Sequence, residues 1–171
     1  MSVENFYSPD NGILTQMPMD KRYKLIGEVV TLMLGSEMHR GYLINDIGAV
    51  FFPPMHLNQF RIYRKGDRPI GMITWAWLSE EVEKQYVTGK YNLKPKDWNG
   101  GDRGWVIDFM APFGHTKQIV HDLKHNIFPD KVGKAIRMTP DGKIKGIWKL
   151  HGANCIKEAK DMSLEGLVLP E

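Results

Sequence analysis

The 171-residue sequence is poor in cysteine and has no long hydrophobic run. Its single cysteine, Cys155, excludes an internal disulfide and any Cys-x-x-Cys metal or redox motif. The longest apolar stretches, such as residues 71–78, are much shorter than the roughly 18–20 residues that a transmembrane helix needs. The beginning of the chain carries acidic residues and no apolar signal segment. We therefore expect a cytoplasmic protein without stable membrane insertion.

Several common catalytic and nucleotide-binding motifs are also missing. The sequence has no G-x-x-x-x-G-K-[ST] phosphate loop, no G-x-G-x-x-G fingerprint and no G-x-S-x-G nucleophile elbow. The glycines of residues 99–104 precede a predicted strand rather than a helix, which is the wrong context for a dinucleotide site. We expect no bound cofactor.

The net charge of +3 is too small to indicate a nucleic acid partner. Positive charge is nevertheless concentrated between Lys117 and Lys149, a segment that contains eight basic and only three acidic residues. We call this segment the basic span. Such a segment is either an ordinary solvated face or a surface for an anionic partner, for example an acidic carrier protein.

The composition is that of one globular domain, with 42% hydrophobic and 25% charged residues. Residues 1–19 predict a mobile arm, residues 20–153 the folded domain, and residues 154–171 a C-terminal helix and tail. Apolar residues at i, i+3 and i+4 spacing predict an amphipathic helix over residues 20–34, which ends at Gly35.

Helical and strand patterns alternate through the rest of the domain. Further helices are predicted from residue 79 and over 116–127, and strands over 59–64, 69–78, 105–110, 135–138 and 144–150, the last two around a turn at 140–142. The sum indicates an α+β fold, an α/β sandwich with a central, mostly antiparallel sheet flanked by helices.

Two polar residues stand out as candidates for chemistry. Asp108 lies within an apolar strand, where an ionised carboxylate is costly unless it is paired. It either faces a solvated side of the sheet or orients a histidine. His39 follows the predicted helix end at Gly35 by four residues, in a loop where a histidine is either a surface residue or a catalytic one.

His121 and His125 have the spacing of a zinc-binding H-E-x-x-H motif, with Asp122 in place of the glutamate. On the predicted helix, however, the pair lies opposite the apolar face and points to solvent. We expect no metal site here. His56 is expected in a loop marked by Pro53 and Pro54, and it is a weaker candidate, as are His115 and His151.

Several segments taken together resemble the RTX toxin-activating lysine acyltransferases, the hemolysin-activating family. The longest match is residues 97–114, which contain the string GDR-x-W-x-ID-x-x-APFG. Shorter matches are residues 38–40, 57–60, 69–76, 128–130, 135–137 and 151–152. The resemblance runs from about Leu25 to Gly152, nearly the whole domain, and on it the sequence is identified as a member of this family.

The resemblance implies an N-acetyltransferase-like fold and transfer of a fatty acyl group from acyl carrier protein to internal lysines of an RTX protoxin. The family's histidine falls on His39, its aspartate on Asp108, and a serine before the histidine on Ser36. Acyl carrier protein and the protoxin are the implied partners, and a homodimer stays open. Glu37 replaces a proline of the usual family sequence, and residues 72–76 read Met-Ile-Thr-Trp-Ala where Tyr-Cys-Ser-Trp-Ala is usual.

Acyl transfer to lysine needs a base, because only about one lysine amine in 10³ is neutral at pH 7. An imidazole is matched to that role, and an aspartate would fix its tautomer. Donors for the oxyanion would be backbone N–H groups near Phe113 and Gly114, or the hydroxyl of Ser36. Direct attack by lysine and an acyl-histidine intermediate on His39 both stay open. The alternative function is a non-catalytic module that binds the carrier protein or the protoxin.

Overall fold

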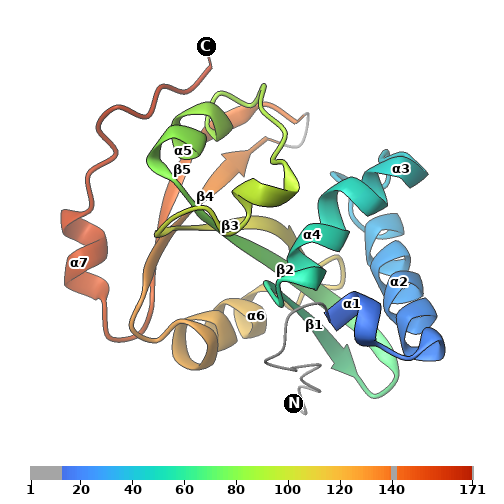
Figure 1. Ribbon diagram of the computed structural model, residues 1–171. Coiled ribbons are helices and arrows are strands. Elements are labelled where there is room, and N and C mark those ends of the chain that lie inside the picture. The colour runs from blue at the N-terminus through green and yellow to red at the C-terminus, as the bar shows by residue number, and fades with distance from the viewer. Residues whose placement is uncertain (1–12, 140–141, 171) are drawn as a thin grey trace. The chain divides into compact units, whose positions relative to one another are not determined.

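The computed structural model describes residues 13–139 and 142–170 (Figure 1). Residues 1–12 of the predicted arm, and part of the turn predicted at 140–142, lie outside the described residues. Beyond residue 12 the chain forms the short helix α1 (Ile13–Gln16), and Leu14 is buried among the core side chains of α2. This end of the predicted arm is therefore packed.

Most of the described residues lie in helices and strands. The helical segments are α1, α2 (Met19–Leu34), α3 (Ile44–Asp46), η1 (Ile47–Phe51), α4 (Phe52–His56), α5 (Glu80–Tyr86), η2 (Pro95–Asp97), α6 (Thr116–Asp122), η3 (Leu123–Ile127) and α7 (Ile156–Asp161). The strands are β1 (Phe60–Lys65), β2 (Arg68–Leu78), β3 (Arg103–Met110), β4 (Val132–Met138) and β5 (Ile144–His151). In the described part of the chain, no helix combines the length and the apolar character that crossing a membrane requires.

The strands form one sheet in the order β1-β2-β3-β4-β5. β1 pairs with β2, and β4 with β5, in antiparallel hairpins. β3 and β4 are parallel, paired through Trp105–Lys134 and Val106–Ala135, because a crossover through α6 joins them. The predicted α+β class is confirmed, with a mixed sheet. The N-acetyltransferase-like fold stays a prediction.

The chain divides into two compact units, each of two segments. The first consists of residues up to 74 and Asp108–Ile119, and the second of Trp75–Ile107 and residues from Val120 onward. β2 and β3 contribute residues to both units, which are described one at a time below.

In the first unit, α2 buries its apolar face against the β1–β2 hairpin. Leu25, Val29 and Leu32 share a cluster with residues of α4, β1 and β2. A buried ion pair accompanies this packing, since Arg64 of β1 donates two hydrogen bonds to the carboxylate of Glu28, at 2.7 and 2.5 Å. Both charges are thereby paired, as burial requires.

Three consecutive helical segments, α3, η1 and α4, were not predicted from the sequence. His56 lies at the end of α4, so its predicted place in a loop is wrong. Pro53 and Pro54 occupy the first turn of α4, where a helix needs no backbone N–H donors. The two prolines therefore begin a helix at the position where a loop is predicted.

The second unit is built around indole rings. Trp98 and Trp105 are buried with Leu78 and Val87. Glu83 of α5 accepts hydrogen bonds from the indole N–H of Trp105 at 2.7 Å and from the ammonium of Lys134 at 2.8 Å. Lys134 is therefore buried and paired, and it does not belong to any exposed part of the basic span.

Candidate active site

A tight turn after α2 presents the predicted histidine. The N–H of His39 donates to the carbonyl of Ser36 at 3.1 Å, and the N–H of Tyr42 donates to the carbonyl of His39 at 3.0 Å. Gly35 precedes this turn, and a Cβ there would lie only 3.0 Å from Cβ of Pro112. The glycine thus lets the end of α2 lie against the loop that follows β3.

The structure brings together the three side chains to which the resemblance pointed. Nε2 of His39 lies 3.4 Å from Oδ1 of Asp108, and Nδ1 of His39 lies 2.7 Å from the hydroxyl of Ser36. His39 and Asp108 are only 4% and 5% exposed, respectively. The buried carboxylate therefore has a histidine as its partner, as predicted, and does not face solvent.

Thr74 holds the other side of the aspartate. Its hydroxyl donates to Oδ2 of Asp108 at 2.6 Å and accepts the backbone N–H of Asp108 at 3.0 Å. Sequence reasoning missed this residue. The available signal was a hydroxyl within the apolar run of β2, at a position where the chain departs from the usual family sequence.

Two aromatic rings flank His39. The ring centroid of Tyr42 lies 5.3 Å from that of His39, and the centroid of Phe51 lies 6.5 Å from it. Burial, followed by the negative charges of Asp108 and Asp46, raises the pKa of the Tyr42 phenol above its usual value of 10.0. Tyr42 is therefore a neutral wall of the site at physiological pH.

Phe113 and Gly114, whose backbone N–H groups are the predicted oxyanion donors, lie in the loop after β3. The ring of Phe113 lies under the guanidinium of Arg68, with 4.5 Å between the guanidinium carbon and the ring centroid. The N–H of Gly114 donates to the carbonyl of Ala111 at 3.2 Å, and Gly114 has a positive φ of 82°. That N–H closes a turn of its own loop, so the structure gives Gly114 no free donor for an oxyanion.

The rings of His121 and His125 stack with their centroids 4.1 Å apart, and both side chains are exposed. Nδ1 of His125 forms a hydrogen bond with the carbonyl of His121 at 2.8 Å, which withdraws one of its nitrogens from ligation. Within residues 13–139 and 142–170, no group of three or more His, Cys, Asp or Glu side chains could hold a metal ion.

The arrangement can perform proton transfer. A neutral imidazole with its hydrogen on Nε2 donates toward Asp108 and accepts the Ser36 hydroxyl hydrogen at Nδ1. Asp108 would then stabilise the imidazolium that forms when Nδ1 takes up a proton. This is the chemistry that acyl transfer between a thioester and an amine requires.

The sequence matches the model of the RTX toxin acyltransferase family over residues 19–149, a range that includes His39, Thr74 and Asp108. The chain belongs to this family. One relative is the RTX-I toxin-activating lysine-acyltransferase ApxIC of Actinobacillus pleuropneumoniae. It is 32% identical to this chain over 136 residues, which cover 80% of this chain and 78% of that protein.

Two further relatives extend the comparison. Protein-lysine myristoyltransferase HlyC of Escherichia coli is 30% identical over 142 residues, 83% of each chain. The uncharacterised protein sll0720 of Synechocystis sp. is 45% identical over 122 residues, which cover 70% of this chain and 83% of that protein. The relatives that carry functional names support an acyltransferase role for the chain.

Proposed function

We propose that this protein transfers a fatty acyl group from acyl carrier protein to internal lysines of an RTX protoxin in the cytoplasm, and so activates the toxin. The observation that supports the proposal is the buried contact between His39 and Asp108, with Ser36 on the second ring nitrogen. One relative named as a toxin-activating lysine acyltransferase and one named as a protein-lysine myristoyltransferase each match 80% or more of the chain, a stretch that includes this region.

In the direct form of the proposed reaction, the lysine amine attacks the thioester carbonyl of the donor. A new C–N bond forms and the C–S bond breaks, which releases the carrier thiol. His39 accepts the proton that the amine loses and returns it to the departing sulfur, while Asp108 stabilises the transient imidazolium. Atoms and electrons balance without a cofactor.

Ser36 occupies the basic nitrogen of His39, so it must take part in or give way to this step. The incoming amine either displaces the Ser36 hydroxyl from Nδ1 and attacks the donor directly, or it attacks an acyl group that has first been transferred to Ser36 or to His39. Ser36→Ala tests the acyl-serine route. Loss of turnover equal to that of His39→Ala supports a covalent acyl-serine, and a smaller loss supports direct attack or an acyl-histidine.

The decisive experiment is co-expression of this protein with a candidate RTX protoxin, followed by mass spectrometry of the protoxin lysines. We expect acylated lysines with the wild-type protein and none with His39→Ala. Asp108→Asn should lower turnover by orders of magnitude, because it preserves shape and removes charge.

Circular dichroism should show that both variants are folded. A folded wild-type protein that binds loaded carrier protein but acylates no lysine would contradict the proposal and support a non-catalytic binding module. Acylation by His39→Ala at the wild-type rate would contradict the assignment of His39.

A further inference from the structure

The proposed reaction places a negative charge on the carbonyl oxygen of the thioester, and this oxyanion needs hydrogen-bond donors. Two of the donors predicted from the sequence are already engaged in the structure. The N–H of Gly114 closes a turn of its own loop, and the hydroxyl of Ser36 is bonded to Nδ1 of His39. The reaction would therefore gain most from a donor beside His39 that gives up no existing hydrogen bond.

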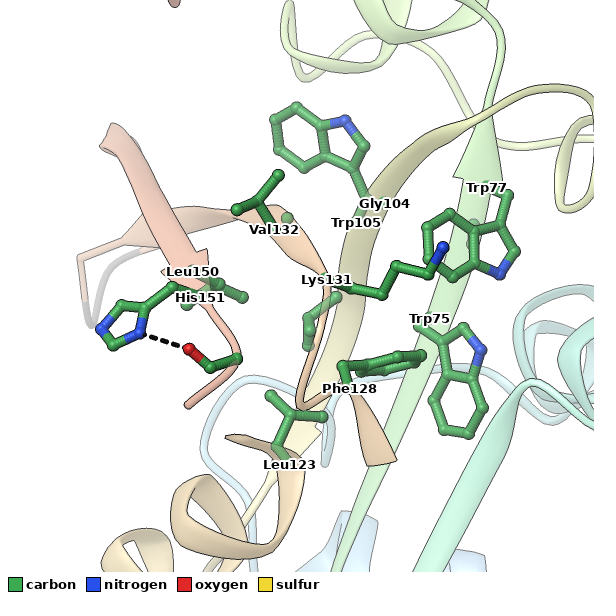
Figure 2. A pocket seen from close by; sticks show the side chains of 14 residues that line it. Trp75, Trp77, Gly104, Trp105, Leu123, Phe128, Lys131, Val132, Leu150 and His151 are labelled. Atoms are coloured by element: carbon green, nitrogen blue, oxygen red, sulfur yellow. Dashed lines mark hydrogen bonds between the residues drawn. The ribbon is translucent and has the colours of Figure 1, made fainter. Parts of the chain in front are cut away.

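The pocket in Figure 2 lies in the second unit and has a different character. The ring of Phe128 stands edge-on to the rings of Trp75 and Trp77, with centroid distances of 5.2 and 5.8 Å. Both ring nitrogens of His151, which also lines the pocket, are already hydrogen-bonded. This lining therefore suits apolar groups rather than an oxyanion.

In the first unit, Tyr42 lies in the same turn as the histidine. Its N–H donates to the carbonyl of His39 at 3.0 Å, and the N–H of the next residue, Leu43, donates to Oδ2 of Asp46 at 2.7 Å. The two rings meet at an angle of 53°, with their centroids 5.3 Å apart. Because the backbone is held on both sides of Tyr42, the phenol keeps a fixed place beside the imidazole.

The hydroxyl of Tyr42 is available to a substrate. Of the two aromatic neighbours of His39, Phe51 is fully buried, whereas Tyr42 is 39% exposed. Within residues 13–139 and 142–170, no side chain or carbonyl accepts a hydrogen bond from this hydroxyl. A ligand that reaches the buried histidine can therefore take up the hydroxyl hydrogen without breaking a bond inside the protein.

Charge keeps that hydrogen in place. Burial comes first, followed by the carboxylates of Asp108 and Asp46, and together they raise the pKa of the Tyr42 phenol above 10.0. The phenol is thus neutral, and it is a donor, over the physiological range. The charge of Asp108 also opposes a second negative charge nearby, so an oxyanion formed at His39 requires a donor more than it would in a neutral site.

We propose that the hydroxyl of Tyr42 donates a hydrogen bond to the oxyanion of the tetrahedral intermediate, as a further catalytic residue. The inference rests on the proposed function, which supplies the reacting carbonyl. When the nucleophile bonds to the carbonyl carbon, the π electron pair moves onto the oxygen, where Tyr42 stabilises it without transferring a proton. The pair returns to form C=O again as the C–S bond breaks.

Tyr42→Phe tests the hydroxyl, because this change keeps the ring beside His39. We expect kcat to fall about 10²-fold, the usual effect of removing one oxyanion donor, with both KM values nearly unchanged. Tyr23→Phe removes a hydroxyl from an exposed position on α2 of the same unit and should leave kcat unchanged. Equal kcat values for the two variants, both folded by circular dichroism, would overturn the proposal.

A pH profile separates donation from packing. 3,5-Difluorotyrosine placed at position 42 lowers the pKa of the phenol, and ¹⁹F NMR of the same protein measures that pKa. We expect kcat to fall as the pH rises through the measured value, because the ionised phenol has no hydrogen to donate. The same substitution at Tyr23 should add no such fall. A rate that stays constant while position 42 ionises would overturn the proposal.

Cleavage of a small thioester keeps this proposal separate from the proposed function. The octanoyl thioester of N-acetylcysteamine, with water as the acceptor, forms the same oxyanion and releases a thiol that a thiol-reactive dye detects. Wild-type protein that cleaves this probe about 10²-fold faster than Tyr42→Phe but acylates no protoxin lysine would support the role of Tyr42 and contradict the proposed function. Acylation and probe cleavage by Tyr42→Phe at the wild-type rates would contradict the role of Tyr42 alone.

Discussion

Besides its contact with His39, Asp108 is held by two hydrogen bonds with one side chain, that of Thr74. Thr74 donates to its carboxylate and accepts its backbone N–H, and all these groups are buried. A buried carboxylate that loses such a donor is free to rotate away from His39 and is left partly unsatisfied, at a cost of about 1–3 kcal/mol. Thr74 is therefore a positioning residue rather than a catalytic one.

We expect Thr74→Val, which keeps the shape of the side chain, to lower kcat about tenfold or more and to leave both KM values nearly unchanged. Thr74→Ser, which keeps the hydroxyl, should retain most of the activity. Steady-state kinetics with loaded carrier protein and protoxin measure the difference. Equal kcat values for the Val and Ser variants would show that the hydroxyl does not position Asp108.

At the scale of elements, the end of β5 depends on a close backbone approach. A Cβ at Gly152 would lie 2.0 Å from the carbonyl oxygen of Phe128 and 2.1 Å from that of Pro129. The N–H of Gly152 also donates to the carbonyl of Lys131 at 2.8 Å. Because backbone atoms surround this position, a side chain there requires the segment after η3 to move.

Gly152→Ala should therefore lower the free energy of unfolding by about 3 kcal/mol or more, since backbone must shift to relieve the clash. Gly146→Ala, within β5, is the matched control. A Cβ at Gly146 meets no atom within 4 Å, and we expect a change within about 1 kcal/mol. Urea unfolding measures both, and similar midpoints for the two variants would contradict the role of Gly152.

The local sequence pattern predicts most helices and strands correctly, and it fails where it conflicts with packing. The helix over residues 20–34 was predicted within one residue of α2, because its 3.6-residue apolar period acts along one element. The helix predicted over residues 116–127 is α6 followed by the π turn η3, a change that no local period signals. The loop predicted at Pro53 and Pro54 is wrong, because proline can begin a helix as well as prevent one.

At the scale of the whole molecule, the basic span is less uniform than its composition suggests. Lys134 is buried against Glu83, and Lys124 bonds to His151. Lys145 and Lys149 of β5 remain exposed. If this part of the span attracts an acidic carrier protein, its effect is electrostatic, and it acts mainly on association rate and salt sensitivity.

We expect Lys145→Glu combined with Lys149→Glu to raise the KM for the acyl donor several-fold and to leave the KM for protoxin unchanged. Higher ionic strength should have a similar effect on the wild-type protein. Lys90→Glu combined with Lys96→Glu changes the net charge equally at exposed positions outside the span and serves as the control. Equal donor KM values for the two double variants would identify the span as an ordinary solvated face.

The sequence by itself determined the periodic elements, the family and the two residues of the candidate dyad, because these depend on residues close together or on a distinctive string. Tertiary structure decided what surrounds the dyad. Thr74 comes to Asp108 across the sheet, and Ser36 meets Nδ1 only through the turn after Gly35. It also buried Lys134 and formed the pocket beside Phe128. Apart from the local contact between Ser36 and His39, these contacts join distant segments, and their formation depends on side-chain packing, which no local pattern encodes.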